Sequence, residues 1–243
     1  MTEDERKILE FGAQHRAILL GHVQALLNVS ASDADRRLAD LARRGLTRHH
    51  RTHHRQAGHH QITSRGLAAI HSPLPEPRFE TIREHRHDMS LPWLTLLAQR
   101  GGLGTVERVV TERAMRHHDA IQRLREQHRP QPDSEPDDEP IYGVALGTGR
   151  DKTVVRHYPD LMLTTPQGRV AIELQARQPA PHQLATQIVA YGADPHIVTA
   201  LYLVDNPQIG ETVQTTAARL GLSNPTHVQT FEFGKDTPVT TAQ

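Results

Sequence analysis

The feature that most constrains the fold is VTALYLV at residues 198–204, in which every residue except Thr199 is apolar. A strand of this composition is typically buried on both faces, as in a sheet covered by helices. The surrounding pattern agrees, because hydrophobic periodicity and turn residues outline further strands and helices. These are strands at 157–165 and 170–176 joined by a turn at 166–169, helices at 180–193 and 207–222, and a last strand at 227–233. The C-terminal third is therefore predicted to be α/β.

The first 70 residues have a different pattern. Apolar residues at helical spacing predict two helices within 4–27. A third helix should begin at an N-cap, Ser30 or Ser32, and end at Gly45. Its buried stripe comprises Ala34, Leu38 and Leu41. A polar hairpin, a short strand and a small helix follow, which is the order of a winged helix-turn-helix. In that module the third helix enters the major groove of DNA and the hairpin, or wing, lies on phosphate.

Charge is unevenly distributed, although the formal net charge is zero. Eight arginines but only one acid, Asp40, lie between Arg36 and Arg65, whereas five acids and no base lie between Asp133 and Glu139. This asymmetry indicates an anionic partner for one face, and we expect that partner to be double-stranded DNA. The near absence of acids suggests that the arginines are free to contact it. The predicted DNA-contacting residues are Ser32, Arg36, Arg37, Arg43 and Arg44 in the third helix, and Arg48, Arg51 and Arg55 in the wing.

The predicted wing contains HHRTHHRQAGHH at 49–60, with six of the 18 histidines. A metal site, a solvated loop without a partner and a surface for phosphate are the alternatives. Adjacent histidines in a strand point to opposite faces, which suits one ligand per pair rather than chelation. Neighbouring arginines favour phosphate contact. They are Arg44, Arg48, Arg51 and Arg55.

The domain organisation follows from composition. We expect a winged helix at 1–72, a proline-rich linker at 73–79 and an α/β domain at 80–243, with a loop or disordered insert near 129–140. The helix expected after the linker should break near Pro92.

The chain has no cysteine, which excludes disulfides and thiolate zinc sites. No run approaches the roughly 18 apolar residues of a membrane span, and the N-terminus lacks the apolar core of a signal peptide. We therefore expect a cytoplasmic protein with no membrane partner.

Three polar residues interrupt the apolar hairpin of the C-terminal third: Asp160, Glu173 and Gln175. Glu173 and Gln175 are two apart on one strand and share a face. Carboxylates on neighbouring strands, here Asp160 and Glu173, can bind one Mg²⁺, with Mn²⁺ as a substitute. Such an ion would lower the pKa of a bound water and neutralise charge on a scissile phosphate. The alternative is that these acids simply face solvent.

The spacing PD-x12-E-x-Q resembles the PD-(D/E)XK core of restriction endonucleases. The resemblance implies that Asp160 and Glu173 bind metal, and that Gln175 stands where a lysine usually assists the attacking water. Gln187 and Tyr191 match a Q-x3-Y pattern of RecB-like members of that group.

A broader resemblance covers most of the chain. The order of a winged helix, VVTER at 109–113, the PD…GRVAIEL hairpin and the LYLV strand is similar to the replication-relaxation family of plasmids and other mobile elements. It implies DNA binding and a role in plasmid maintenance or transfer. Family members commonly carry E-x-E at the hairpin, from which Gln175 departs. Glu112, within the VVTER segment, is a further candidate for the acidic site, or a surface acid beside Arg113.

Three hypotheses follow for an α/β (α+β) protein of this organisation. The first is a Mg²⁺-dependent DNA endonuclease or nickase. The second is a replication or transcription regulator whose inactive nuclease fold serves as a scaffold or second DNA grip. The third is a histidine metal sensor. A homodimer is compatible with each of them.

Overall fold

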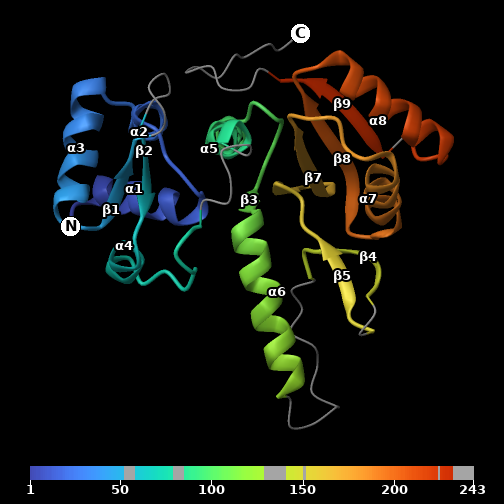
Figure 1. The fold of residues 1–243 in the computed structure, drawn as a ribbon, viewed down its shortest axis with the longest axis horizontal. Coiled ribbons are helices and arrows are strands. Elements are labelled where there is room, and N and C mark those ends of the chain that lie inside the picture. Colours follow the sequence, from blue (N-terminus) through green and yellow to red (C-terminus); the bar gives the residue numbers. More distant parts are fainter. Residues whose placement is uncertain (52–57, 79–84, 129–140, 150–151, 224, 232–243) are drawn as a thin grey trace. The chain divides into compact units, whose positions relative to one another are not determined.

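The computed structural model describes residues 1–51, 58–78, 85–128, 141–149, 152–223 and 225–231. The chain is a mixed α/β protein, as its sequence predicts, and divides into two compact units (Figure 1). The first comprises Met1–Gly104 and the second Thr105–Phe231. Arg55 and the insert expected near 129–140 lie outside the described residues.

The N-terminal unit contains three helices, a hairpin and two further helices among the residues described. They are α1 (Glu3–Gln14), α2 (Leu20–Leu27), α3 (Ala31–Arg43), β1 (Thr47–His50), β2 (His59–Ile62), α4 (Ser64–Ala69) and α5 (His85–Gln99). Ser30 is the N-cap of α3, because its hydroxyl accepts the N–H of Asp33 at 3.2 Å. Ile18 forms an isolated antiparallel bridge with His60 of β2.

The core of this unit is apolar and includes the predicted α3 stripe, since Ala34, Leu38 and Leu41 are all buried. Trp93 and Leu96 of α5 belong to the same core. Helix α5 therefore packs with the N-terminal unit, and the boundary falls between Gly104 and Thr105, later than the linker expected at 73–79.

Helix α5 also runs through Pro92 without the predicted break. A proline lacks the N–H that would donate to the carbonyl four residues earlier, and its ring crowds that carbonyl. Here the proline ring is buried, as are the flanking Trp93 and Leu94. Packing of α5 against the rest of the N-terminal unit thus keeps the residues before and after Pro92 in one helix.

The C-terminal unit is built on a mixed five-stranded sheet of order β3-β6-β7-β8-β9. Its elements are β3 (Arg108–Thr111), α6 (Glu112–Gln127), β4 (Val144–Thr148), β5 (Val154–His157), β6 (Leu161–Thr165), β7 (Gly168–Gln175), α7 (Pro181–Ala193), β8 (Ile197–Val204), α8 (Pro207–Arg219) and β9 (Thr226–Thr230). Strands β3, β6 and β7 are antiparallel neighbours, whereas β8 and β9 continue parallel to β7. Strands β4 and β5 form a separate hairpin.

The apolar strand β8 lies between β7 and β9; its residues 202–204 are buried, as its composition predicts, whereas Val198 is 43% exposed. Helices α7 and α8 cover one face of the sheet through a core that also holds Ala171 of β7 and Tyr202 of β8. Glu173 is two residues after Ala171 and is paired in register with Tyr202, so it shares this face. The sheet thereby carries an acid beneath α7.

Candidate functional site

Glu173 of β7 is the centre of a buried polar cluster in the C-terminal unit. Its side chain is 5% exposed, and its partner in register, Tyr202, is fully buried. A carboxylate with so little contact with water needs protein donors, because desolvation disfavours its charge.

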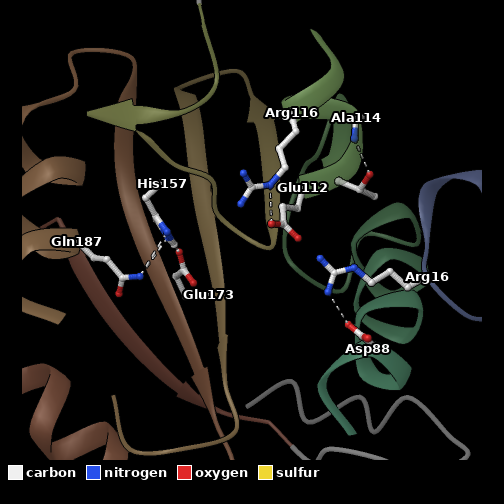
Figure 2. A network of polar contacts seen from close by, with 9 residues as sticks. Arg16, Asp88, Glu112, Ala114, Arg116, His157, Glu173 and Gln187 are labelled. Carbon is white, nitrogen blue, oxygen red and sulfur yellow. Dashed lines mark hydrogen bonds and ion pairs between the residues drawn. The ribbon is translucent and has the colours of Figure 1, made fainter. Parts of the chain in front are cut away.

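Two side chains supply those donors to the same oxygen. Oε1 of Glu173 lies 2.6 Å from Nε2 of His157 and accepts the hydroxyl of Tyr191. His157 is the last residue of β5, and Tyr191 projects from α7. One turn earlier on α7, the amide nitrogen of Gln187 lies 3.3 Å from Nε2 of His157. Figure 2 shows the imidazole between Glu173 and Gln187.

Asp160 lies in the short segment between β5 and β6. Leu161 pairs with Ile172, so the antiparallel register places Asp160 opposite Glu173. Its Oδ2 accepts the backbone N–H of Leu174 at 2.7 Å. One carboxylate oxygen of Asp160 thus binds the main chain of the strand that carries Glu173.

The electrostatics of the cluster follow from burial and from its several acids. Burial raises the pKa of Glu173, His157 opposes that rise, and Asp160 adds to it. For His157, burial lowers the pKa, but Glu173, Asp160 and Glu112 together outweigh it, and the net pKa is raised. Burial and the neighbouring Glu173 also raise the pKa of Tyr191, which therefore stays a hydroxyl donor.

The two predicted metal ligands, Asp160 and Glu173, face each other across neighbouring strands, and one oxygen of each accepts protein donors. Oε1 of Glu173 accepts two side-chain donors and Oδ2 of Asp160 accepts a backbone N–H. Among the described residues, no group of three or more histidine or acidic side chains is arranged to hold a metal ion. Metal binding by Asp160 and Glu173 therefore stays a prediction.

The other residues predicted for this site lie around the cluster. Gln175 ends β7, where it is half-buried and in register with Val204. The carboxylate of Glu112 binds Nε of Arg116 at 2.8 Å (Figure 2), and its N–H donates to the carbonyl of Asp160 at 3.2 Å. Gln187 and Tyr191, singled out by the Q-x3-Y spacing, both contact the cluster.

Sequence reasoning misses His157. It directly precedes the segment Tyr158–Pro159–Asp160, and a histidine three residues before a candidate ligand is a usable signal. The sequence predicts one strand through 157–165, whereas β5 ends at His157 and β6 begins at Leu161. This break lets His157 approach Glu173 from a different hairpin.

In the N-terminal unit, α3 presents an exposed stripe at helical spacing. It comprises Ser32, Arg36, Ala39 and Arg43. Arg36 binds Asp33, and Arg43 lies 3.1 Å from Asp40, yet the two arginine side chains are 72% and 73% exposed. The hydroxyl of Ser32 lies 3.0 Å from that of Ser30.

Two other predicted DNA contacts, Arg37 and Arg44, bind acids of α1. Arg37 lies 3.0 Å from Asp4 with its side chain only 24% exposed, and Arg44, just after α3, lies 2.8 Å from Glu5. The expectation that the arginines lack nearby acids and are free to contact DNA is therefore wrong for Arg37 and Arg44. Local charge counting misses these acids because they precede the basic segment by some 30 to 40 residues in sequence.

The hairpin β1–β2 carries further predicted contacts. Arg48 and Arg51 are exposed, although Arg48 lies 4.0 Å from Glu76. The histidines form two cross-strand pairs, His49 with His60 and His50 with His59, with ring centroids 4.7 and 5.1 Å apart. Adjacent histidines thus occupy opposite faces, as predicted. Burial, reinforced by His49, lowers the pKa of His60 to about 4.

No protein-family model matches the chain, and a search of curated proteins gives no match. Within the described residues, every helix is too short or too polar to span a bilayer.

Proposed function

We propose that this chain is a double-stranded DNA-binding protein whose N-terminal unit is a winged helix-turn-helix with α3 as its recognition helix. The observation that carries the proposal is the exposed α3 stripe with Arg36 and Arg43 at its surface. The order α1–α2–α3 followed by the β1–β2 hairpin supports it. In such modules the third helix enters the major groove.

The acids beside Arg36 and Arg43 do not oppose this role. Exposed ion pairs between residues three apart on a helix contribute only about 0.2–0.5 kcal/mol. A DNA phosphate can therefore replace Asp33 or Asp40 at little cost. Arg37 and Arg44 differ, because their own side chains are less exposed, at 24% and 39%, and their partners lie on α1, so these ion pairs join α1 to the third helix. We assign those two arginines to the fold rather than to DNA contact.

The β1–β2 hairpin would be the wing. Arg48, His49 and Arg51 are exposed on it, and phosphate contacts by such residues position a protein without reading sequence. The exposed histidine ring adds a hydrogen-bond donor even when neutral.

For the C-terminal unit we propose a PD-(D/E)XK nuclease-like fold that acts as a scaffold or second DNA grip. Support comes from the strand arrangement around Asp160 and Glu173 and from the engagement of their oxygens by protein donors. A regulator of replication-relaxation type, belonging to a plasmid or other mobile element, is the biological role consistent with both units.

Salt-dependent binding tests the N-terminal proposal. Binding of a duplex DNA library to the full chain should weaken with salt, and Arg36→Ala with Arg43→Ala should flatten the log–log slope by about 0.9 for each phosphate that the variant no longer neutralises. Arg6→Ala with Lys7→Ala is the matched control, since these exposed cations of α1 also have acids one turn away. Equal slopes for wild type and the α3 double variant would rule out α3 as the DNA contact.

Metal-dependent DNA cleavage is the second candidate, with Asp160 and Glu173 holding Mg²⁺ or Mn²⁺ and Gln175 placing water. One observation favours it: the antiparallel register places Asp160 opposite Glu173, and Oδ2 of Asp160 accepts the N–H of Leu174, the residue after Glu173. Supercoiled plasmid incubated with either ion distinguishes the candidates. Nicking by wild type that Asp160→Ala abolishes would establish cleavage, and its absence would favour the regulator.

A further inference from the structure

The N-terminal unit has a surface pocket between the end of α3 and the start of α4. Its volume is about 760 Å³, which lies within the range of ligand-binding pockets. Three arginines line it, Arg43, Arg44 and Arg65, together with the small or apolar residues Leu46 and Ala68. Guanidinium groups favour phosphate and carboxylate, because they donate several hydrogen bonds in one plane. The pocket therefore has the composition of an anion site.

Thr63 fixes the start of α4 against the end of α3. Its hydroxyl donates to the carbonyl of Gly45 at 2.7 Å and accepts the N–H of Gly66 at 3.1 Å. Gly45 has a φ of 71°, and a Cβ there would lie 3.8 Å from Nη1 of Arg65. Arg65, two residues after Thr63, thus meets the arginines at the end of α3 in one pocket.

Among the described residues, Arg65 is the pocket arginine without an acid as a partner. Arg43 and Arg44 share Asp40, at 3.1 and 3.2 Å. Arg44 also contacts Glu5 at 2.8 Å. Three guanidinium groups therefore face two carboxylates, which leaves the positive charge of Arg65 unbalanced.

Two neighbouring features leave this charge in place. Glu76 also approaches α4, but it accepts the N–H of Ser64 at 2.9 Å and lies 4.0 Å from Arg48. The C-terminal end of α3 carries a partial negative charge, yet two of its carbonyls accept the N–H groups of Gly45 and Leu46. Arg65 is thus available to an anion from outside the chain.

Arg43 connects this pocket to the proposed DNA surface, because it also belongs to the exposed α3 stripe. We propose that the pocket takes a backbone phosphate of DNA, with Arg65 as the contacting cation and Arg43 beside it. Leu46 and Ala68 would pack against the attached deoxyribose. The inference rests on the proposed function and adds to it a contact from α4, outside both the recognition helix and the wing.

Salt-dependent binding of duplex DNA to the full chain tests the pocket. Arg65→Ala should flatten the log–log slope by about 0.9, because one phosphate is no longer neutralised. Arg65→Lys keeps the charge and should keep the slope of wild type. Arg6→Ala is the matched control, since Arg6 is an exposed arginine of α1 that does not line the pocket, and should also keep that slope.

Ala68→Glu tests the same site with Arg65 in place. Ala68 is exposed on α4, three residues after Arg65, so a glutamate there can pair with the guanidinium and repel a phosphate. Ala68→Glu should flatten the slope at least as much as Arg65→Ala. Ala68→Gln, of similar size but uncharged, should not. Circular dichroism verifies that each variant is folded.

A wild-type slope for Arg65→Ala would overturn the proposal, as would an equal change in Arg6→Ala. Arg36→Ala, outside the pocket, separates this failure from failure of the proposed function. A flattened slope for Arg36→Ala beside a wild-type slope for Arg65→Ala rejects the pocket alone, whereas absence of salt-dependent DNA binding rejects both.

Titration with inorganic phosphate at constant ionic strength distinguishes the two sources of a phosphate group. Saturable binding that Arg65→Ala removes, together with an unchanged DNA slope, would assign the pocket to a free phosphate and overturn the proposal. A flattened DNA slope without saturable binding of the free ion supports the DNA backbone as the source.

Discussion

The carboxylate of Asp119 in α6 accepts the backbone N–H of Tyr142 with both oxygens, at 3.0 and 3.2 Å. Oδ2 also accepts the N–H of Gly143 at 2.9 Å, and the side chain is fully buried. These bonds join Asp119 to residues 23 and 24 positions later in the sequence. They thereby anchor the segment before β4 to α6.

Asp119→Ala should destabilise the C-terminal unit by about 2–3 kcal/mol, because buried N–H groups lose their acceptor. Asp119→Asn should also destabilise it, since an amide offers one acceptor oxygen instead of two. Urea unfolding followed by circular dichroism measures the effect. Glu126→Ala is the control from the same helix, where the side chain is exposed; a cost as large as that of Asp119→Ala would contradict the anchoring role.

Two helical glycines should respond oppositely to alanine. A Cβ at Gly66 would lie 2.1 Å from the carbonyl oxygen of Leu46, whereas one at Gly12 would meet only Ile18 and Ile62, at 3.7 Å. Gly66→Ala should cost about 1–3 kcal/mol through overpacking. Gly12→Ala should stabilise by about 0.5–1 kcal/mol, because glycine inside a helix is entropically unfavourable. Chemical denaturation of both variants measures the pair, and a tolerated Gly66→Ala would disprove the close approach.

Trp93 should be essential to the N-terminal unit. It is 5% exposed, and its ring meets His22 of α2 edge-on with centroids 4.7 Å apart. Trp93→Ala should cost about 3–5 kcal/mol, as expected for truncation of a buried aromatic side chain. Thermal unfolding measured by circular dichroism should show the loss, whereas Gln99→Ala, at an exposed position of the same helix, should change little. Unchanged thermal stability of the N-terminal unit in Trp93→Ala would instead favour the domain boundary at 73–79 that the sequence predicts.

His22 should make stability depend on pH. Burial lowers its pKa from 6.5 to about 3, an effect that the backbone of Met89 partly offsets, and Nδ1 accepts the N–H of Leu19 at 3.0 Å. The unfolded state binds the proton below pH 6.5 while the folded state resists it. Stability contributed by neutral His22 is therefore full above pH 6.5 and falls by up to about 1.4 kcal/mol per unit as the pH drops toward 3.

Urea unfolding at several pH values from about 7 to about 4 measures this slope. His22→Gln keeps an acceptor for Leu19 without a titrating group, so its stability should vary less with pH than that of wild type. Half-buried His60, with a pKa lowered to about 4, contributes to the slope of both proteins. Identical slopes would show that His22 does not carry the effect.

Local patterns in the sequence predict much of the secondary structure. The N-cap at Ser30, the stripe of Ala34, Leu38 and Leu41, and the apolar strand at 198–204 all lie as expected. These features depend on neighbours within a few residues, because helix and strand periods determine which side chains share a face. The hairpin predicted for residues 157–176 likewise places Asp160 beside the strand that carries Glu173.

Tertiary structure decided how distant segments meet. Arg37 binds Asp4 rather than facing outward, Trp93 joins the N-terminal core, and His157 reaches Glu173 from another hairpin. Periodicity identifies the buried face of an element but not the element that covers it. The charge balance of a helix, the boundary of a domain and the state of a carboxylate all depend on that covering element, and therefore only the folded chain determines them.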